Sequence, residues 1–233
     1  MKKIAIGLLG LAITASAQNF DPILKKHVVD GRVDYRGLKA DSQLLETYLQ
    51  QAGAVPESEF NTWAEKQQLA FLINLYNAAT LQLVVDHYPV KSIKKIKHRF
   101  KGPWDQPVVP MFGKKISLNT LEHKIIRPTY KEPRVHMALV CAAKGCPILR
   151  SEAYTAERLD EQLDNQSHRY LAPPAGLVVD RKKGMASISS IFKWYGGDFS
   201  SVSAFVEKYS GQSILELKIK YLNYDWSLNE QVR

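Results

Sequence analysis

The stretch LAFLINLYNAATLQLVV, residues 69–85, is the most apolar part of the chain beyond its N-terminal region. Its length is marginal for a membrane span, and the side-chain amides of Asn74, Asn77 and Gln82 interrupt it. We therefore predict a buried central helix around which the rest of the chain folds. Asn74 and Asn77 lie one helical turn apart on a shared face. A buried amide needs hydrogen-bond partners, so the two either hold neighbouring backbone in place or line a ligand-binding site.

Periodicity and turn signals outside this helix predict several shorter elements. Helices are expected over residues 42–52, 118–127, 155–170, 200–209 and 213–222, with Ser117 as an N-cap and Pro128 as a stop. Strands are expected over residues 32–35, 134–141, 177–180 and 186–188, and a hairpin over residues 108–116. Together they predict a helix-rich α+β domain with a small antiparallel sheet.

The first seventeen residues have the pattern of a secretory signal peptide. Lys2 and Lys3 form a positive start, an uncharged apolar stretch follows, and Ala15-Ser16-Ala17 fits a cleavage site. We therefore expect residues 1–17 to be removed and residues 18–233 to form a single globular domain. That domain is expected to be secreted or periplasmic, with no transmembrane segment after cleavage.

The chain carries a formal net charge of +9. Many of its basic residues fall within residues 91–101, where Ile93, Ile96 and Phe100 recur at helical spacing. A basic amphipathic helix fits an anionic component of the cell envelope, although a solvated surface has the same pattern. A peptide is the alternative class of partner. No nucleic-acid-binding motif occurs in the sequence.

The chain has two cysteines, Cys141 and Cys146, both in the segment CAAKGCP. In an oxidising compartment, two cysteines this close favour a disulfide. The alternative is that one of them is a thiolate nucleophile, which needs a neighbouring base or positive field. Two cysteines and scattered histidines lack the spacing of a zinc site, so we expect neither a metal nor another cofactor.

Three residues near the cysteines in sequence qualify as acid–base partners. Glu122 and His123 are neighbours on a predicted helix, where their side chains point about 100° apart. His136 lies on the predicted strand that ends at Cys141, and its odd spacing would place the two on opposite faces of a regular strand. A turn at the cysteine would remove that objection, so His123 and His136 both remain candidate bases.

Three arginines lie in the same part of the chain: Arg127, Arg134 and Arg150. An arginine binds carboxylates and phosphates through its bidentate guanidinium. The three therefore qualify as ligand-binding residues for an anionic or carbonyl-bearing ligand. They fit equally well as ion-pair partners of Glu122 and nearby acids.

Several motifs carry a family resemblance, in the order WAEKQQLAFLINLYNAATLQLVVDHYP, ISLNTLEHKIIRP, PRVHMALVCAAKGCPILR, ISSIFKWYGGDF and YLNYDWSLN. They resemble the family catalogued as domain of unknown function 547, over residues 30–229, and the chain looks like an exported bacterial member. The resemblance implies family motifs at Asn74, Tyr76, Asn77, Glu122, His123, Arg127, His136, Cys141, Cys146, Pro147, Lys193, Trp194 and Tyr195. The family name records no established activity, so the resemblance selects residues rather than a reaction.

Two classes of function fit these observations. The first is a cysteine-dependent hydrolase or acyl transferase of the cell envelope, with Cys141 or Cys146 attacking a carbonyl and His123 or His136 as the base. Backbone amides or Asn77 would stabilise the oxyanion. The second is a non-catalytic binding or scaffold domain with a Cys141–Cys146 disulfide and structural histidines. The redox state of the two sulfurs separates these hypotheses.

Overall fold

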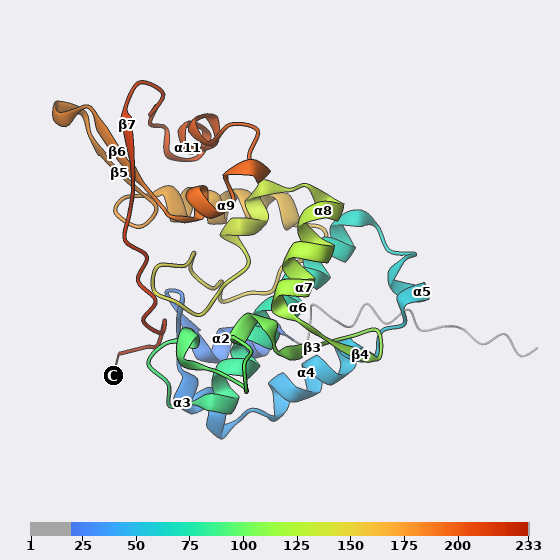
Figure 1. Ribbon diagram of the computed structural model, residues 1–233. Helices are drawn as coiled ribbons and strands as arrows, with labels where there is room; N and C mark the ends of the chain where they lie inside the picture. Colours follow the sequence, from blue (N-terminus) through green and yellow to red (C-terminus); the bar gives the residue numbers. More distant parts are fainter. Residues whose placement is uncertain (1–19, 233) are drawn as a thin grey trace, which may run out of the picture.

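A computed structural model describes residues 20–232 (Figure 1). The predicted signal peptide, residues 1–17, lies outside the described residues. The described chain is helix-rich and contains three small sheets, so the predicted α+β class is confirmed. Two clusters of buried side chains make up the core, a larger one around the central helix and a smaller one beside the three-stranded sheet.

The central helix is α6, Glu65–His87, and most of its side chains are buried. By length and composition alone it could cross a membrane, but 89% of its apolar window is covered by other parts of the protein. Its hydrophobic residues occupy every face, as in a helix enclosed by its own domain. The predicted buried helix is thus confirmed and extends a few residues beyond both predicted ends.

The larger core forms where short elements pack around α6. On its outer side lie α3 (Tyr35–Ala40), α4 (Gln43–Ala54) and the hairpin of β3 (Pro107–Met111) and β4 (Lys114–Ser117). Helix α2 (Asp21–His27) and the two-residue strands β1 (Val28–Val29) and β2 (Arg32–Val33) complete the N-terminal part. The predicted helix over residues 42–52 and the predicted hairpin are both confirmed.

The smaller core lies between two helices and the three-stranded sheet, at the upper left in Figure 1. The helices are α9 (Leu159–Leu171) and α11 (Val202–Ser210). Strand β6 (Met185–Ile188) pairs antiparallel with β5 (Leu177–Asp180) and parallel with β7 (Lys218–Tyr221). After β7 the chain runs back along one edge of the molecule toward α2 and α3 (Figure 1).

Two predicted elements have a different conformation. Residues 134–141 were expected to form a strand, but they form the 3-10 helix η4 (Pro133–Met137) and an irregular loop. A short apolar run is buried in either conformation, so its composition does not distinguish them. Residues 213–222 were expected to be helical, but Lys218–Tyr221 is the edge strand β7.

The basic segment over residues 91–101 also differs from the prediction. Only Ile93–Lys95 forms a helical turn, the 3-10 helix η1. Ile93 and Ile96 are buried, but Phe100 is fully exposed, so the segment lacks the continuous apolar face of an amphipathic helix. The predicted basic amphipathic helix is therefore wrong. Apolar residues at helical spacing in the sequence are here buried one at a time from a mostly non-helical segment.

The helix that carries Glu122 continues past its predicted stop. Ser117 caps it as predicted, accepting a hydrogen bond from the Thr120 amide at 3.0 Å. The helix then runs through α7 (Leu118–Thr120), the π-helical segment η3 (Leu121–Ile126) and α8 (Arg127–Tyr130). Pro128 lies inside this continuous helix, just after the π-helical segment η3, and does not end it.

Candidate functional site

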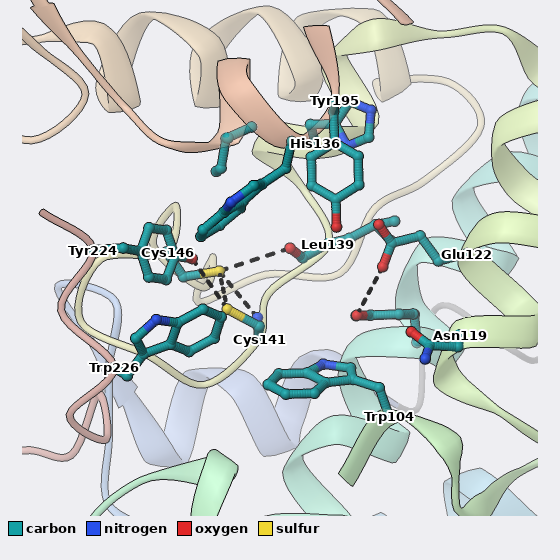
Figure 2. Close-up of a pocket in the computed structure, with 13 residues that line it drawn as sticks. Trp104, Asn119, Glu122, His136, Leu139, Cys141, Cys146, Tyr195, Tyr224 and Trp226 are labelled. Carbon is teal, nitrogen blue, oxygen red and sulfur yellow. Dashed lines mark hydrogen bonds between the residues drawn. The ribbon is translucent and has the colours of Figure 1, made fainter. Parts of the chain in front are cut away.

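A pocket of about 260 Å³ opens where the two cores meet (Figure 2). Its lining comes from widely separated parts of the chain: α6, η2 (Pro103–Asp105), η3, η4, the loop after η4, α10 (Ile191–Trp194) and the C-terminal segment. The residues that line it are Tyr76, Trp104, Asn119, Glu122, His136, Leu139, Cys141, Cys146, Ile191, Trp194, Tyr195, Tyr224 and Trp226. It therefore gathers four of the predicted site residues, Glu122, His136, Cys141 and Cys146.

The two cysteine sulfurs face each other at one side of this pocket. The Cys141 thiol donates to the Cys146 sulfur at 3.0 Å, and the Cys141 backbone amide donates to the same sulfur at 3.0 Å. A disulfide bond is about 2.0 Å long, so both cysteines are free thiols here. The predicted Cys141–Cys146 disulfide is therefore not formed, although the loop holds the sulfurs close together.

The surroundings of the two sulfurs are unequal. Hydrogen bonding with Cys146 lowers the pKa of the Cys141 thiol, and bonds from Tyr224 and the Ala143 amide lower it further. Burial raises the pKa of the Cys146 thiol well above its usual range. Since Cys141 is also the more exposed of the two, it is the sulfur better able to act as a nucleophile.

Local backbone contacts explain the shape of the cysteine loop. The amides of Lys144 and Gly145 donate to Ser227 and Asp225 of the C-terminal segment, each at 2.8 Å. A β-carbon on Gly145 would lie 2.8 Å from the Asp225 nitrogen, so only glycine fits this approach. Ala142 has a φ of 56°, which turns the chain directly after Cys141.

Both asparagines of α6 bind backbone groups. Asn77 donates to the Ala138 carbonyl at 3.0 Å and accepts from the Val140 amide at 2.9 Å. Asn74 binds the carbonyl and amide of Tyr154 in the same way, at 2.8 and 2.9 Å. Neither lines the pocket. Of their two predicted roles, the geometry shows the positioning of neighbouring backbone.

A charged network supports His136 behind the pocket. His136 Nε2 lies 2.7 Å from an oxygen of Asp198, and Arg127 binds both oxygens of that carboxylate, at 2.6 and 2.9 Å. The His136 ring stacks on Tyr195 with ring centres 4.2 Å apart. Burial lowers the pKa of His136 despite the nearby Asp198. Burial therefore favours the neutral imidazole, and the bond to Asp198 and the stacking on Tyr195 fix its orientation.

Glu122 occupies the opposite side of the pocket from the sulfurs (Figure 2). Its side chain is buried, and it accepts a hydrogen bond from the Tyr76 hydroxyl at 3.1 Å. The Tyr195 hydroxyl also hydrogen-bonds to it. His123 lies beside it, with Nδ1 3.8 Å from Glu122 Oε1 and 2.8 Å from Arg127 Nη1.

The two candidate histidine bases are not hydrogen-bonded to the cysteine sulfurs. Within residues 20–232, neither cysteine sulfur has a hydrogen bond with a histidine nitrogen. His136 lines the same pocket but is hydrogen-bonded to Asp198, and His123 does not line it. A direct cysteine–histidine dyad is thus not assembled in this structure.

The other two predicted arginines lie outside the pocket, in ion pairs. Arg134 binds Glu132, Asp160 and Asp164, and Arg150 binds Glu152. The part of the chain that the structure describes contains no group of three or more His, Cys, Asp or Glu side chains placed to hold a metal ion.

The sequence interpretation missed the individual roles of Trp104, Trp226, Tyr224 and Asp198. Each except Trp104 lies in a motif that carried the family resemblance, ISSIFKWYGGDF or YLNYDWSLN. Those motifs were informative, but no periodicity indicates that the C-terminal segment returns to the cysteine loop.

One comparison with known proteins gives a match. Residues 60–171 match the family model described as protein of unknown function, DUF547. The match includes α6, Glu122, His136 and both cysteines and supports a domain of this family. Searches of the curated proteins and of the solved structures gave no match.

Proposed function

We propose that this domain, related to a family without an assigned activity, catalyses thiol–disulfide exchange. Cys141 would be the attacking thiolate, and Cys146 the thiol that resolves the intermediate. The observation that carries the proposal is the pair of sulfurs 3.0 Å apart, with the pKa of Cys141 lowered and that of Cys146 raised. A partly exposed thiol of lowered pKa beside a buried thiol of raised pKa is the arrangement that two-step exchange requires.

The reaction balances without a cofactor. The Cys141 thiolate attacks a substrate disulfide, which forms a mixed disulfide and releases one half of the substrate as a thiolate. Cys146 gives its proton to a departing thiolate and attacks the Cys141 sulfur, which releases the second half and leaves a Cys141–Cys146 disulfide. A dithiol reductant would return the pair to its reduced form by the reverse steps.

The domain is proposed to act in the cell envelope, in keeping with the signal-peptide pattern of residues 1–17. In an oxidising compartment, a disulfide between these cysteines would be one state of a working cycle. The free thiols and the Cys141–Cys146 disulfide, which the sequence left as alternatives, would then be two states of one reaction cycle.

A cysteine hydrolase or acyl transferase uses the same Cys141 thiolate. It also needs a proton donor for the leaving group and donors for an oxyanion. Asn77 is engaged with backbone, and the sulfurs have no histidine partner among the described residues. The geometry therefore favours disulfide exchange over acyl transfer, and over a scaffold with inert sulfurs.

Trapping the mixed disulfide tests the proposal. Reduced Cys146→Ser protein mixed with 2-hydroxyethyl disulfide, a small uncharged disulfide, should accumulate 2-mercaptoethanol on Cys141, measured as an added mass on the intact protein. The unaltered protein should instead release 2-mercaptoethanol and gain an internal disulfide, and Cys141→Ser should do neither.

Two results would contradict exchange. One is an unaltered protein that keeps 2-mercaptoethanol on Cys141 without forming the internal bridge. The other is a Cys141 that forms a stable acyl adduct with an activated ester but does not react with disulfides, which would support acyl transfer.

A further inference from the structure

Six tyrosine and tryptophan side chains line the pocket together with one carboxylate, that of Glu122: Tyr76, Trp104, Trp194, Tyr195, Tyr224 and Trp226. Tyr224 and Trp226 lie on the side of the sulfurs, and Tyr195 lies nearer Glu122 (Figure 2). The indoles and Tyr224 form a continuous cluster, with ring centres of Trp194 and Tyr224 4.9 Å apart and those of Tyr224 and Trp226 4.6 Å apart. Aromatic ring faces attract cations through their quadrupoles. Two of these rings already carry a protein cation, since Lys94 Nζ lies 4.7 Å from the Trp226 ring centre and the Arg127 guanidinium carbon 4.9 Å from that of Tyr195.

The charged groups at the pocket also favour a cation over an anion. Among residues 20–232, Glu122 is the only carboxylate in the lining, and no lysine or arginine of this part of the chain lines the pocket. Burial favours the neutral form of His136, and the nearby Arg127 is paired with Asp198. Cys141 adds a second negative charge when its thiol ionises. The pocket therefore favours cations. The chain as a whole carries a net charge of +9 and would repel a cation elsewhere on its surface.

We infer that the pocket binds a small organic ammonium ion against Glu122 and the aromatic walls. Resting on the proposed function, this assigns the exchange substrate to low-molecular-weight disulfides that carry an ammonium group. The carboxylate would hold the ammonium end, while the disulfide reaches the sulfurs across the cavity. A cavity of about 260 Å³ accommodates a ligand of that size.

Binding can be measured without any thiol chemistry. Choline should quench or shift the tryptophan fluorescence of the reduced protein, while its uncharged analogue 3,3-dimethylbutanol should bind at least about tenfold more weakly. Glu122→Gln should weaken choline binding about tenfold, because an ionic contact becomes a neutral one. Glu216→Gln, the same change at an exposed position outside the pocket, should leave binding unchanged.

A second variant covers the case in which Glu122→Gln does not fold. Trp194 is 45% exposed, so its replacement by leucine leaves the core intact. Trp194→Leu should weaken choline binding about threefold. Equal binding of choline and dimethylbutanol, or unchanged choline binding in both Glu122→Gln and Trp194→Leu, would overturn the ammonium site.

The exchange reaction tests the substrate class separately. Cystamine, a disulfide with two ammonium groups, should oxidise the unaltered protein at least about tenfold faster than neutral 2-hydroxyethyl disulfide, after correction for their reactivity with a free thiol. This ratio should fall toward one in Glu122→Gln. Choline binding with no exchange by either disulfide would overturn the proposed function alone. Equal corrected exchange rates would overturn the substrate class alone.

Discussion

The Cys141 sulfur lies next to three different hydrogen-bonding groups. They are the Cys146 thiol, the Ala143 amide and the Tyr224 hydroxyl, whose oxygen is 3.2 Å away. As a thiol, Cys141 donates to Cys146. Once it ionises, all three groups can donate to its sulfur, which stabilises the thiolate and outweighs the effect of burial on its pKa. Tyr224 is the one donor that can be removed without changing the loop backbone or the partner cysteine.

Tyr224→Phe should therefore raise the pKa of Cys141. The rate of Cys141 alkylation by iodoacetamide, followed against pH by mass spectrometry, should reach its plateau at higher pH than in the unaltered protein. At pH 7 the rate should fall about ten- to a hundredfold, the loss expected for one hydrogen bond to a charged group. Tyr221→Phe, an exposed residue on β7, is the control, and equal profiles for the two variants would contradict this role of Tyr224.

At the scale of a single element, α6 positions two different loops through its asparagines. Asn77 holds the backbone that leads to Cys141, while Asn74 holds the backbone at Tyr154. Both side chains are almost fully buried, so either change to alanine should destabilise the fold by about 2–5 kcal/mol through two unpaired backbone groups. Urea unfolding would measure this free energy.

The two variants should differ in the chemistry of Cys141. Asn77→Ala should slow its alkylation and shift its pH profile, because the loop that aligns Cys141 with its donors is released. Asn74→Ala has a matched stability cost and should keep the profile of the unaltered protein. If both variants shift the profile equally, the effect is general loosening rather than positioning by Asn77.

The segment that follows the cysteine loop is tied to α9 by an ion-pair cluster. Burial alone would raise the pKa of Glu152, but bonds from Arg150, Arg158 and Gln162 lower it from 4.5 to about 2. The carboxylate therefore binds a proton more weakly in the folded state than in the unfolded state. Its stabilisation is complete above pH 4.5 and is lost as the pH falls toward 2.

Glu152→Gln should lower the free energy of unfolding at pH 7 by about 2 kcal/mol, allowing for solvent screening of the partly exposed Arg158. The gap between variant and unaltered protein should narrow below pH 4.5. Urea unfolding at pH 7 and pH 3 would measure it, with Glu157→Gln, an exposed carboxylate in the same segment, as the control. A gap that is independent of pH would contradict the assignment to Glu152 ionisation.

At the scale of the whole molecule, the elements predicted correctly are those whose local sequence pattern fits only one conformation. The apolar length of α6, the hairpin at Gly113 and the Ser117 cap depend on local chemistry and are confirmed. The segments over residues 134–141 and 213–222 fit more than one conformation by composition, and tertiary contacts decided between them. The cysteine loop was recognised as a site, but its aromatic walls depend on a C-terminal return that no local pattern encodes.

The C-terminal segment that follows β7 contacts both cores. Leu222 donates to the Ile188 carbonyl beside the small sheet at 2.8 Å, and Asn229 donates to Ala142 in the cysteine loop at 3.0 Å. The Tyr35 hydroxyl, in the N-terminal part, donates to the Asn229 side chain at 2.7 Å. One segment of about ten residues thus connects the sheet, the site and the first helices, so neither core is complete without it.

We therefore expect one cooperative unfolding transition despite the two cores. Of the four tryptophans of the chain, Trp104, Trp194 and Trp226 line the pocket, so fluorescence follows the C-terminal segment while far-UV circular dichroism follows α6 and the other helices. The two urea curves of the reduced protein should coincide. Asn229→Ala removes the link to Tyr35 and should shift both curves together to lower urea. A fluorescence transition that precedes the loss of helix would show that the segment detaches first and that the two cores are stable independently.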